Sequence, residues 1–128
     1  MLARGEHKHA RARLQELRKQ HPSDADYPVA LSRLCFERRR YDEGLAALRA
    51  AIRIDPQRRS DPVLIKEVID SLQSDRFAST AEDYLRELGS VAKPHVKEAA
   101  RSHPSRRVRE RARDLLRDWG RKPLFRWR

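Results

Sequence analysis

Five histidines and one cysteine are the side chains of this 128-residue chain with the chemistry to ligate a metal or attack a substrate. His7 and His9 come closest to a pair, but residues i and i+2 of a helix point to different sides. The chain has no HExxH sequence and no Cys/His cluster. Cys35 has no histidine near it in the sequence and falls at an apolar helical position, where a thiol acts as a small hydrophobic group. We therefore predict no metal site and no nucleophilic cysteine.

Adjacent carboxylates are the remaining candidates for acid–base chemistry. Asp42 with Glu43, and Glu82 with Asp83, each stand at the start of an expected helix. The helix macrodipole favours negative charge there, so electrostatic capping explains both pairs without catalysis. The chain contains no Walker, GxSxG, Rossmann or protein-kinase motif. We predict a protein that is not an enzyme and holds no cofactor, unless distant carboxylates converge in one pocket.

Arginine is concentrated near the C-terminal end and suggests a second kind of chemistry, the binding of phosphate. The formal net charge is +11, and both ends of the chain are basic around a nearly neutral centre. Glu110, Asp114 and Asp118 interrupt the arginines and can pair with them at helical spacing, so a solvated surface is the competing interpretation. The candidate phosphate-binding residues share one side of a helix or continue into the tail; they are Arg106, Arg109, Arg113, Arg117, Arg121 and Lys122.

The elements that must position these side chains are predicted to be helices only. Alanine, leucine, arginine and glutamate dominate, and no segment alternates with the period of two that marks a strand. A single cysteine excludes an intrachain disulfide and fits a reducing compartment. No apolar run approaches the roughly 20 residues that span a bilayer. These features predict an all-α, cytoplasmic protein without a membrane span.

A helical hairpin is predicted over residues 27–56. Its first helix has an apolar stripe at Leu31, Leu34 and Cys35, and Pro56 ends the second. Residues 27–56 resemble one tetratricopeptide (TPR) repeat. The residues that carry the resemblance are Leu31, Leu34, Tyr41-Asp42-Glu43, Leu48, Ala51 and Asp55-Pro56, and the departures from the family pattern are Pro28, Ser32 and Gly44.

The segment before this hairpin repeats part of its pattern. Ala10, Leu14 and Pro22 precede Gly44, Leu48 and Pro56 by 34 residues, which is the period of TPR arrays. We therefore predict a TPR-like region at 7–56 after a disordered lead at 1–6. Because half a repeat leaves an apolar stripe unpaired, we also expect further sequence on its N-terminal side in the natural protein.

Residues 57–119 resemble HEAT-like repeats. Asp61 and Pro62 are predicted to begin one helix, and Ser79 with Glu82 to form a capping box at the next. The residues that carry the resemblance are Leu88-Gly89, Ala92, Pro94, Val96, Val108-Arg109 and Arg111-Ala112. The resulting prediction is a right-handed α-solenoid of about seven helices, in which a TPR-like pair merges into HEAT-like pairs, followed by a basic aromatic tail at 120–128.

The resemblance implies a non-catalytic protein–protein interaction or scaffold module. Similar segments occur in large multidomain bacterial proteins, including serine/threonine kinases, which implies a regulatory segment of such a protein. The implied partner is another protein or a peptide, of acidic character, and not a small-molecule substrate; nucleic-acid binding through the arginines is the alternative. In TPR repeats the exposed face of the first helix lines the binding groove, and here that face is Asp26, Val29, Arg33, Phe36, Glu37 and Arg40. That helix lacks the asparagine with which some members clamp a C-terminal carboxylate. For Phe36, burial in the core is the alternative to exposure on this face.

Overall fold

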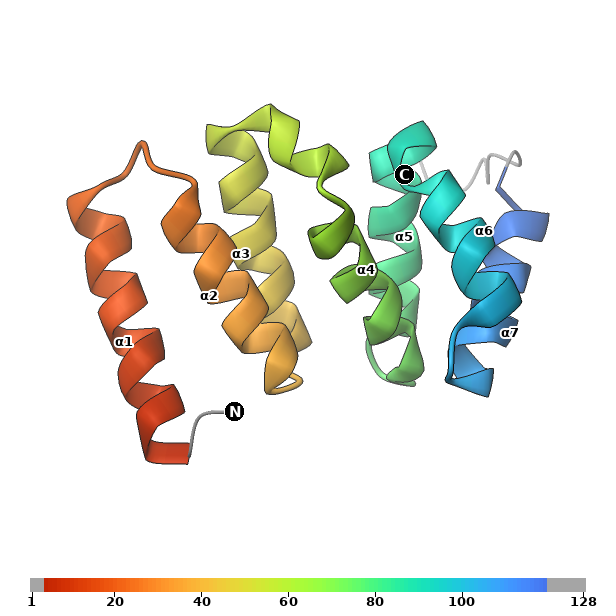
Figure 1. Cartoon of the computed structure of the whole chain (residues 1–128), viewed down its shortest axis with the longest axis horizontal. Helices are drawn as coiled ribbons and strands as arrows, with labels where there is room; N and C mark the ends of the chain where they lie inside the picture. The colour runs from red at the N-terminus through yellow and green to blue at the C-terminus, as the bar shows by residue number, and fades with distance from the viewer. Residues whose placement is uncertain (1–3, 120–128) are drawn as a thin grey trace, which may run out of the picture. The chain divides into compact units, whose positions relative to one another are not determined.

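The computed structural model describes residues 4–119, and within this range all regular structure is helical (Figure 1). The all-α prediction is confirmed, as is the number of helices. The seven α-helices are α1 (Arg4–Gln20), α2 (Asp26–Glu37), α3 (Tyr41–Ile54), α4 (Pro62–Asp70), α5 (Ala78–Leu88), α6 (Lys93–Ser102) and α7 (Arg106–Arg117). The chain divides into an N-terminal unit, Met1–Glu67, and a C-terminal unit, Val68–Arg128. The handedness of a solenoid and the HEAT-like assignment stay predictions.

The core of the N-terminal unit forms where α1, α2 and α3 pack side by side (Figure 1). Leu31 and Cys35 of α2 pack with Ala47 of α3, and Leu14 of α1 packs against this cluster. Leu48 is almost completely buried on α3. The apolar stripes predicted for the hairpin therefore meet one another, because residues three and four apart share a helix face.

The turn between α2 and α3 consists of Arg38, Arg39 and Arg40. The amide of Arg40 donates to the carbonyl of Cys35 at 2.8 Å, and the amide of Arg39 donates to the carbonyl of Phe36 at 3.0 Å. These two bonds form a Schellman motif, in which the residue after the helix adopts a left-handed backbone. Arg39 does so with a φ of 61°. The motif allows α3 to begin at Tyr41, two residues later.

Two capping aspartates connect α3 to α4. Asp55 accepts the amide of Gln57 and begins a short 3-10 helix, Pro56–Ser60. Asp61 accepts the amide of Val63 at 2.9 Å. The predicted N-terminal cap at Asp61, followed by Pro62 at the first helical position, is confirmed.

The C-terminal unit is built around aliphatic side chains from α5, α6 and α7. Leu85, Val96 and Val108 are each fully buried, and Leu115 is 1 % exposed. The predicted sequence of helix, tight turn and helix after Gly89 is confirmed as α6, a turn at 103–105, and α7. Gly89 ends α5 with a φ of 70°, as expected of a glycine at this position.

Three predicted helix starts are wrong by two or three residues. Helix α1 begins at Arg4, so residues 4–6 are helical where a disordered lead was predicted. Helix α5 begins at Ala78, one residue before Ser79, and the amide of Phe77 is bonded to the Ser74 hydroxyl. The predicted capping box is therefore absent, because the buried side chains of Phe77 and Ala78 determine where this helix begins. Helix α6 begins at Lys93 instead of Val91, which leaves its proline in the first turn.

None of the helices in the described range is long and apolar enough to cross a membrane.

Candidate functional site

One side of α2 carries the residues that the sequence assigns to partner binding. Asp26, Arg33 and Glu37 lie on this side, and all three are exposed. Val29 beside them is half-buried. The Nε atom of Arg33 lies 3.6 Å from the Glu67 carboxylate, and 58 % of the Arg33 side chain remains exposed. We call Asp26, Val29, Arg33 and Glu37 the α2 face.

Phe36 does not belong to this face. It is 8 % exposed. Its ring lies so close to Gly44 of α3 that a Cβ at Gly44 would be 3.1 Å from the ring. The ring of Tyr41 lies beside it, with 6.2 Å between the centroids. The assignment of Phe36 to the exposed face is thus corrected, and the core alternative holds, because Gly44 leaves room for an aromatic ring between the helices.

Arg40 lies beyond the end of α2, in the turn. Its guanidinium is 3.1 Å from one oxygen of the Glu43 carboxylate, and Arg11 of α1 is 3.0 Å from the other oxygen. Both arginines keep part of their side chains exposed. Exposed pairs of this kind contribute little to stability, so Arg40 remains available to a partner.

An open, mostly polar depression of about 730 Å³ lies at the other end of this hairpin. Arg58 bonds the carboxylate of Asp26 there and lies 3.4 Å from that of Asp55. The Asp26 hydrogen bond is the largest cause of a raised Arg58 pKa. The sequence did not reveal this depression, because its lining comes from the α1–α2 loop, the end of α3 and the following 3-10 helix.

Cys35 is a core residue, as its position in the apolar stripe predicts. The thiol is 1 % exposed. Burial raises its pKa, and the Glu43 carboxylate adds to the rise, while Arg11 and Arg40 oppose it. A thiol that is both inaccessible and protonated is a poor nucleophile.

We expect Cys35 to react with a thiol reagent at pH 8 at least about a hundredfold more slowly in the folded protein than in denaturant, since reaction requires local opening. Absorbance of the released thiolate follows the reaction, and Cys35→Ala, which has no thiol, supplies the blank. A folded-state rate near the denatured one would contradict the burial of Cys35.

The arginines of α7 are largely engaged within the C-terminal unit. Arg109 donates to the carbonyls of His103 and Pro104 at 2.7 and 3.2 Å. Arg106 pairs with Glu110 and Arg117 with Asp114, each at 3.1 Å. Pairing of the interrupting carboxylates with these arginines is therefore confirmed. Arg113 is exposed, whereas Arg121 and Lys122 lie outside the described residues.

Two further arginines of α7 hold the segment that follows α4. Arg111 donates to the carbonyl of Leu72 and to the carboxylate of Asp75, and Arg107 lies 3.4 Å from the same carboxylate. The hydrogen bond from Arg111, with the charge of Arg107, lowers the pKa of Asp75. Arg107 and Arg111 thus position the backbone, which the sequence alone did not indicate.

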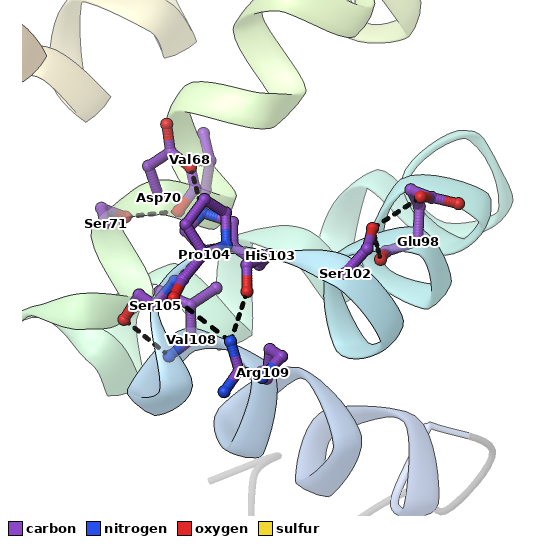
Figure 2. A network of polar contacts seen from close by, with 10 residues as sticks. All are labelled: Val68, Asp70, Ser71, Glu98, Ser102, His103, Pro104, Ser105, Val108 and Arg109. Carbon is purple, nitrogen blue, oxygen red and sulfur yellow. Dashed lines mark hydrogen bonds and ion pairs between the residues drawn. The ribbon is translucent and has the colours of Figure 1, made fainter.

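A polar network around His103 fastens the turn between α6 and α7 (Figure 2). The Nε2 atom of His103 lies 2.6 Å from the Asp70 carboxylate, and its Nδ1 atom accepts the amide of Ser105 at 3.0 Å. The Ser105 hydroxyl in turn accepts the amide of Val108 and caps α7. Because Nδ1 accepts a backbone amide, Nε2 carries the proton and donates to Asp70. In this arrangement neither ring nitrogen is free to act as a base.

Three carboxylates of the described residues, Asp24, Asp26 and Asp55, line the depression beside Arg58. Burial raises the pKa of Glu82 on α5, and the charge of Arg86 opposes the rise. The pKa of Asp75 is lowered instead, because Arg111 donates a hydrogen bond to it. Residues 4–119 hold no group of three or more histidine, cysteine or acidic side chains that could bind a metal ion.

Comparison with known families gives a match to the N-terminal part of the chain. The model of the tetratricopeptide repeat family matches residues 1–62, which covers α1, α2, α3 and the connection to α4. The TPR resemblance of the N-terminal part is thereby confirmed. No curated protein and no solved structure matches the chain.

Proposed function

We propose that the N-terminal unit binds another protein through the α2 face. TPR repeats mediate protein–protein interactions and are typically non-catalytic, and the family match covers the helices that build this face. The observation that carries the proposal is the exposure of Arg33 and Glu37 on α2, next to the buried Leu31 and Cys35 that fix the orientation of the helix. A rigid helix with charged side chains on its free side is a suitable recognition element.

The partner proposed is acidic where it meets Arg33. The Arg33 guanidinium contacts Glu67 through its Nε atom, and the distance of 3.6 Å is long for an ion pair. A guanidinium can hold a carboxylate with two parallel hydrogen bonds, so the weak internal contact can be exchanged for a stronger one. Arg40, exposed in the turn, supplies a second positive charge. We further propose that the chain serves as a regulatory or scaffold segment of a larger bacterial protein, such as a serine/threonine kinase, in the cytoplasm.

The test is to identify the partner by crosslinking in extract of the cells that make the protein, and then to measure its affinity in purified form. Replacing Arg33 and Arg40 together by glutamate should weaken binding about tenfold or more, because two attractions become repulsions. Arg13→Glu, at an exposed arginine of α1, is the matched control and should bind like the wild type. Circular dichroism checks that each variant is folded. Full affinity in the double variant would exclude the α2 face as the binding surface.

The alternative, nucleic-acid binding by α7, receives less support. Phosphate tracking needs a row of positive charge. The carboxylates of Glu110 and Asp114 offset part of the charge on α7, and Arg109 donates to backbone carbonyls. Because the family match covers residues 1–62, we propose the N-terminal unit as the binding part of the chain.

A further inference from the structure

The turn of Arg38, Arg39 and Arg40 combines a charged surface with an unfavourable backbone. Arg39, with a φ of 61°, is the one non-glycine residue with a positive φ in the described range. The left-handed position after a helix is usually glycine, because a Cβ there approaches the backbone too closely. The bonds of Arg39 and Arg40 to the end of α2 hold this conformation in place. Strain that persists in a regular hairpin points to a use for the side chain that causes it.

The positive charge of this turn is only partly neutralised. Glu43 is shared by Arg11 and Arg40, one on each carboxylate oxygen. Within the described residues, no carboxylate pairs with Arg38 or Arg39, and Arg39 is exposed. The N-terminal half of α1 lies beside this end of α2, since His7 of α1 bonds the carbonyl of Leu34 at 3.0 Å. Exposed Lys8 of α1 therefore adds a further cation to the same end of the unit.

We propose that this turn docks an acidic segment of the partner protein, with the Arg39 guanidinium paired to a carboxylate. The proposal rests on the protein-binding function given above and extends it from the α2 face to the adjoining turn. A protein segment fits better than a nucleic acid. Nucleic-acid binding spreads over many phosphates, whereas this cluster is one turn long.

Arg39 allows a test that separates charge from backbone strain. The probe is a short poly-glutamate peptide, and the protein is the full chain at low salt. Arg39→Gly removes both the guanidinium and the strain. It should weaken peptide binding about three- to fivefold, the size of one exposed ion pair. The same variant should melt roughly 2–5 °C higher, because glycine relieves the left-handed position.

Two further variants complete the design. Arg39→Glu keeps a Cβ at the strained position, so its melting temperature should stay near that of the wild type while peptide binding is lost. Arg53→Gln removes one positive charge from an exposed residue near the far end of α3, and its affinity for the peptide should be that of the wild type.

Equal affinity of the wild type and Arg39→Gly, or a lower melting temperature of that variant, overturns the inference. So does tighter binding of single-stranded DNA of matched charge than of the peptide. The protein-binding function is judged separately. If Arg33→Glu lowers the affinity for the crosslinked partner but Arg39→Gly leaves it unchanged, the α2 face is supported and the docking role of the turn is excluded.

Discussion

Leu48→Ala should lower the free energy of unfolding by about 2–5 kcal/mol, the usual cost of truncating a fully buried leucine. Leu48 is 1 % exposed on α3. The TPR pattern and the 34-residue repeat that relates Leu48 to Leu14 both predict a core side chain at this position. The substitution removes buried apolar surface and leaves a cavity that packed helices fill only in part. Chemical denaturation followed by circular dichroism measures the change.

Val63→Ala is the control for this substitution. Val63 is 47 % exposed on α4, so its truncation should change stability by no more than about 0.5 kcal/mol. If both variants unfold at the wild-type denaturant concentration, Leu48 does not contribute to the core, and the hairpin register from which the α2 face is deduced would be wrong.

Gly44→Val should destabilise the protein by about 1–3 kcal/mol, as overpacking of a core commonly does. A Cβ at Gly44 would stand 3.1 Å from the nearest atom of the Phe36 ring and 3.2 Å from two others. Valine adds two methyl groups beyond that Cβ, so α2 and α3 must separate or the ring must move. The loss exceeds the few tenths of a kcal/mol that valine gains over glycine in helix propensity.

Gly5→Val is the matched control. A substitution of Phe36 tests whether its ring is the cause of the destabilisation. An added Cβ at Gly5 meets nothing within 4 Å, so Gly5→Val should be neutral or slightly stabilising. Combining Gly44→Val with Phe36→Leu should cost less than the sum of the two single changes, because the smaller side chain makes room. Strict additivity would show that Phe36 is not what limits the space at Gly44.

Local patterns in the sequence were enough for the helices and for most of their ends. The apolar stripes of α2 and α3 predicted the hairpin, and Asp61 and Gly89 marked a helix start and a helix stop where the structure has them. Such signals succeed because they depend on backbone groups a few residues away. The predicted capping box at Ser79 failed for the opposite reason. Burial of Phe77, a tertiary effect, moved the N-terminal cap of this helix two residues, from Ser79 to Phe77.

The surface residues were harder to assign because exposure depends on what packs nearby. Phe36 and Arg33 are three residues apart and both lie near the outer side of α2 in a helical projection, but only Phe36 finds a space, opened by Gly44. The pairing of Arg106 with Glu110 on α7 was expected from helical spacing, but the bonds of Arg109 and Arg111 to backbone carbonyls were not. Bonds to backbone carbonyls, which the sequence pattern does not show, separated structural arginines from available ones.

The sequence by itself determined an all-helical chain, the TPR character of its N-terminal part and the core positions of Leu48 and Cys35, because helical periodicity and a 34-residue repeat are carried by local residue order. Only the tertiary structure decided that Phe36 is buried, that His103 is bonded to Asp70, and that Arg39 occupies a left-handed position. The first depends on the space that Gly44 leaves on the next helix, and the second on Asp70, which is distant in the chain. The third depends on how tightly the packed hairpin must turn, which no property of arginine predicts.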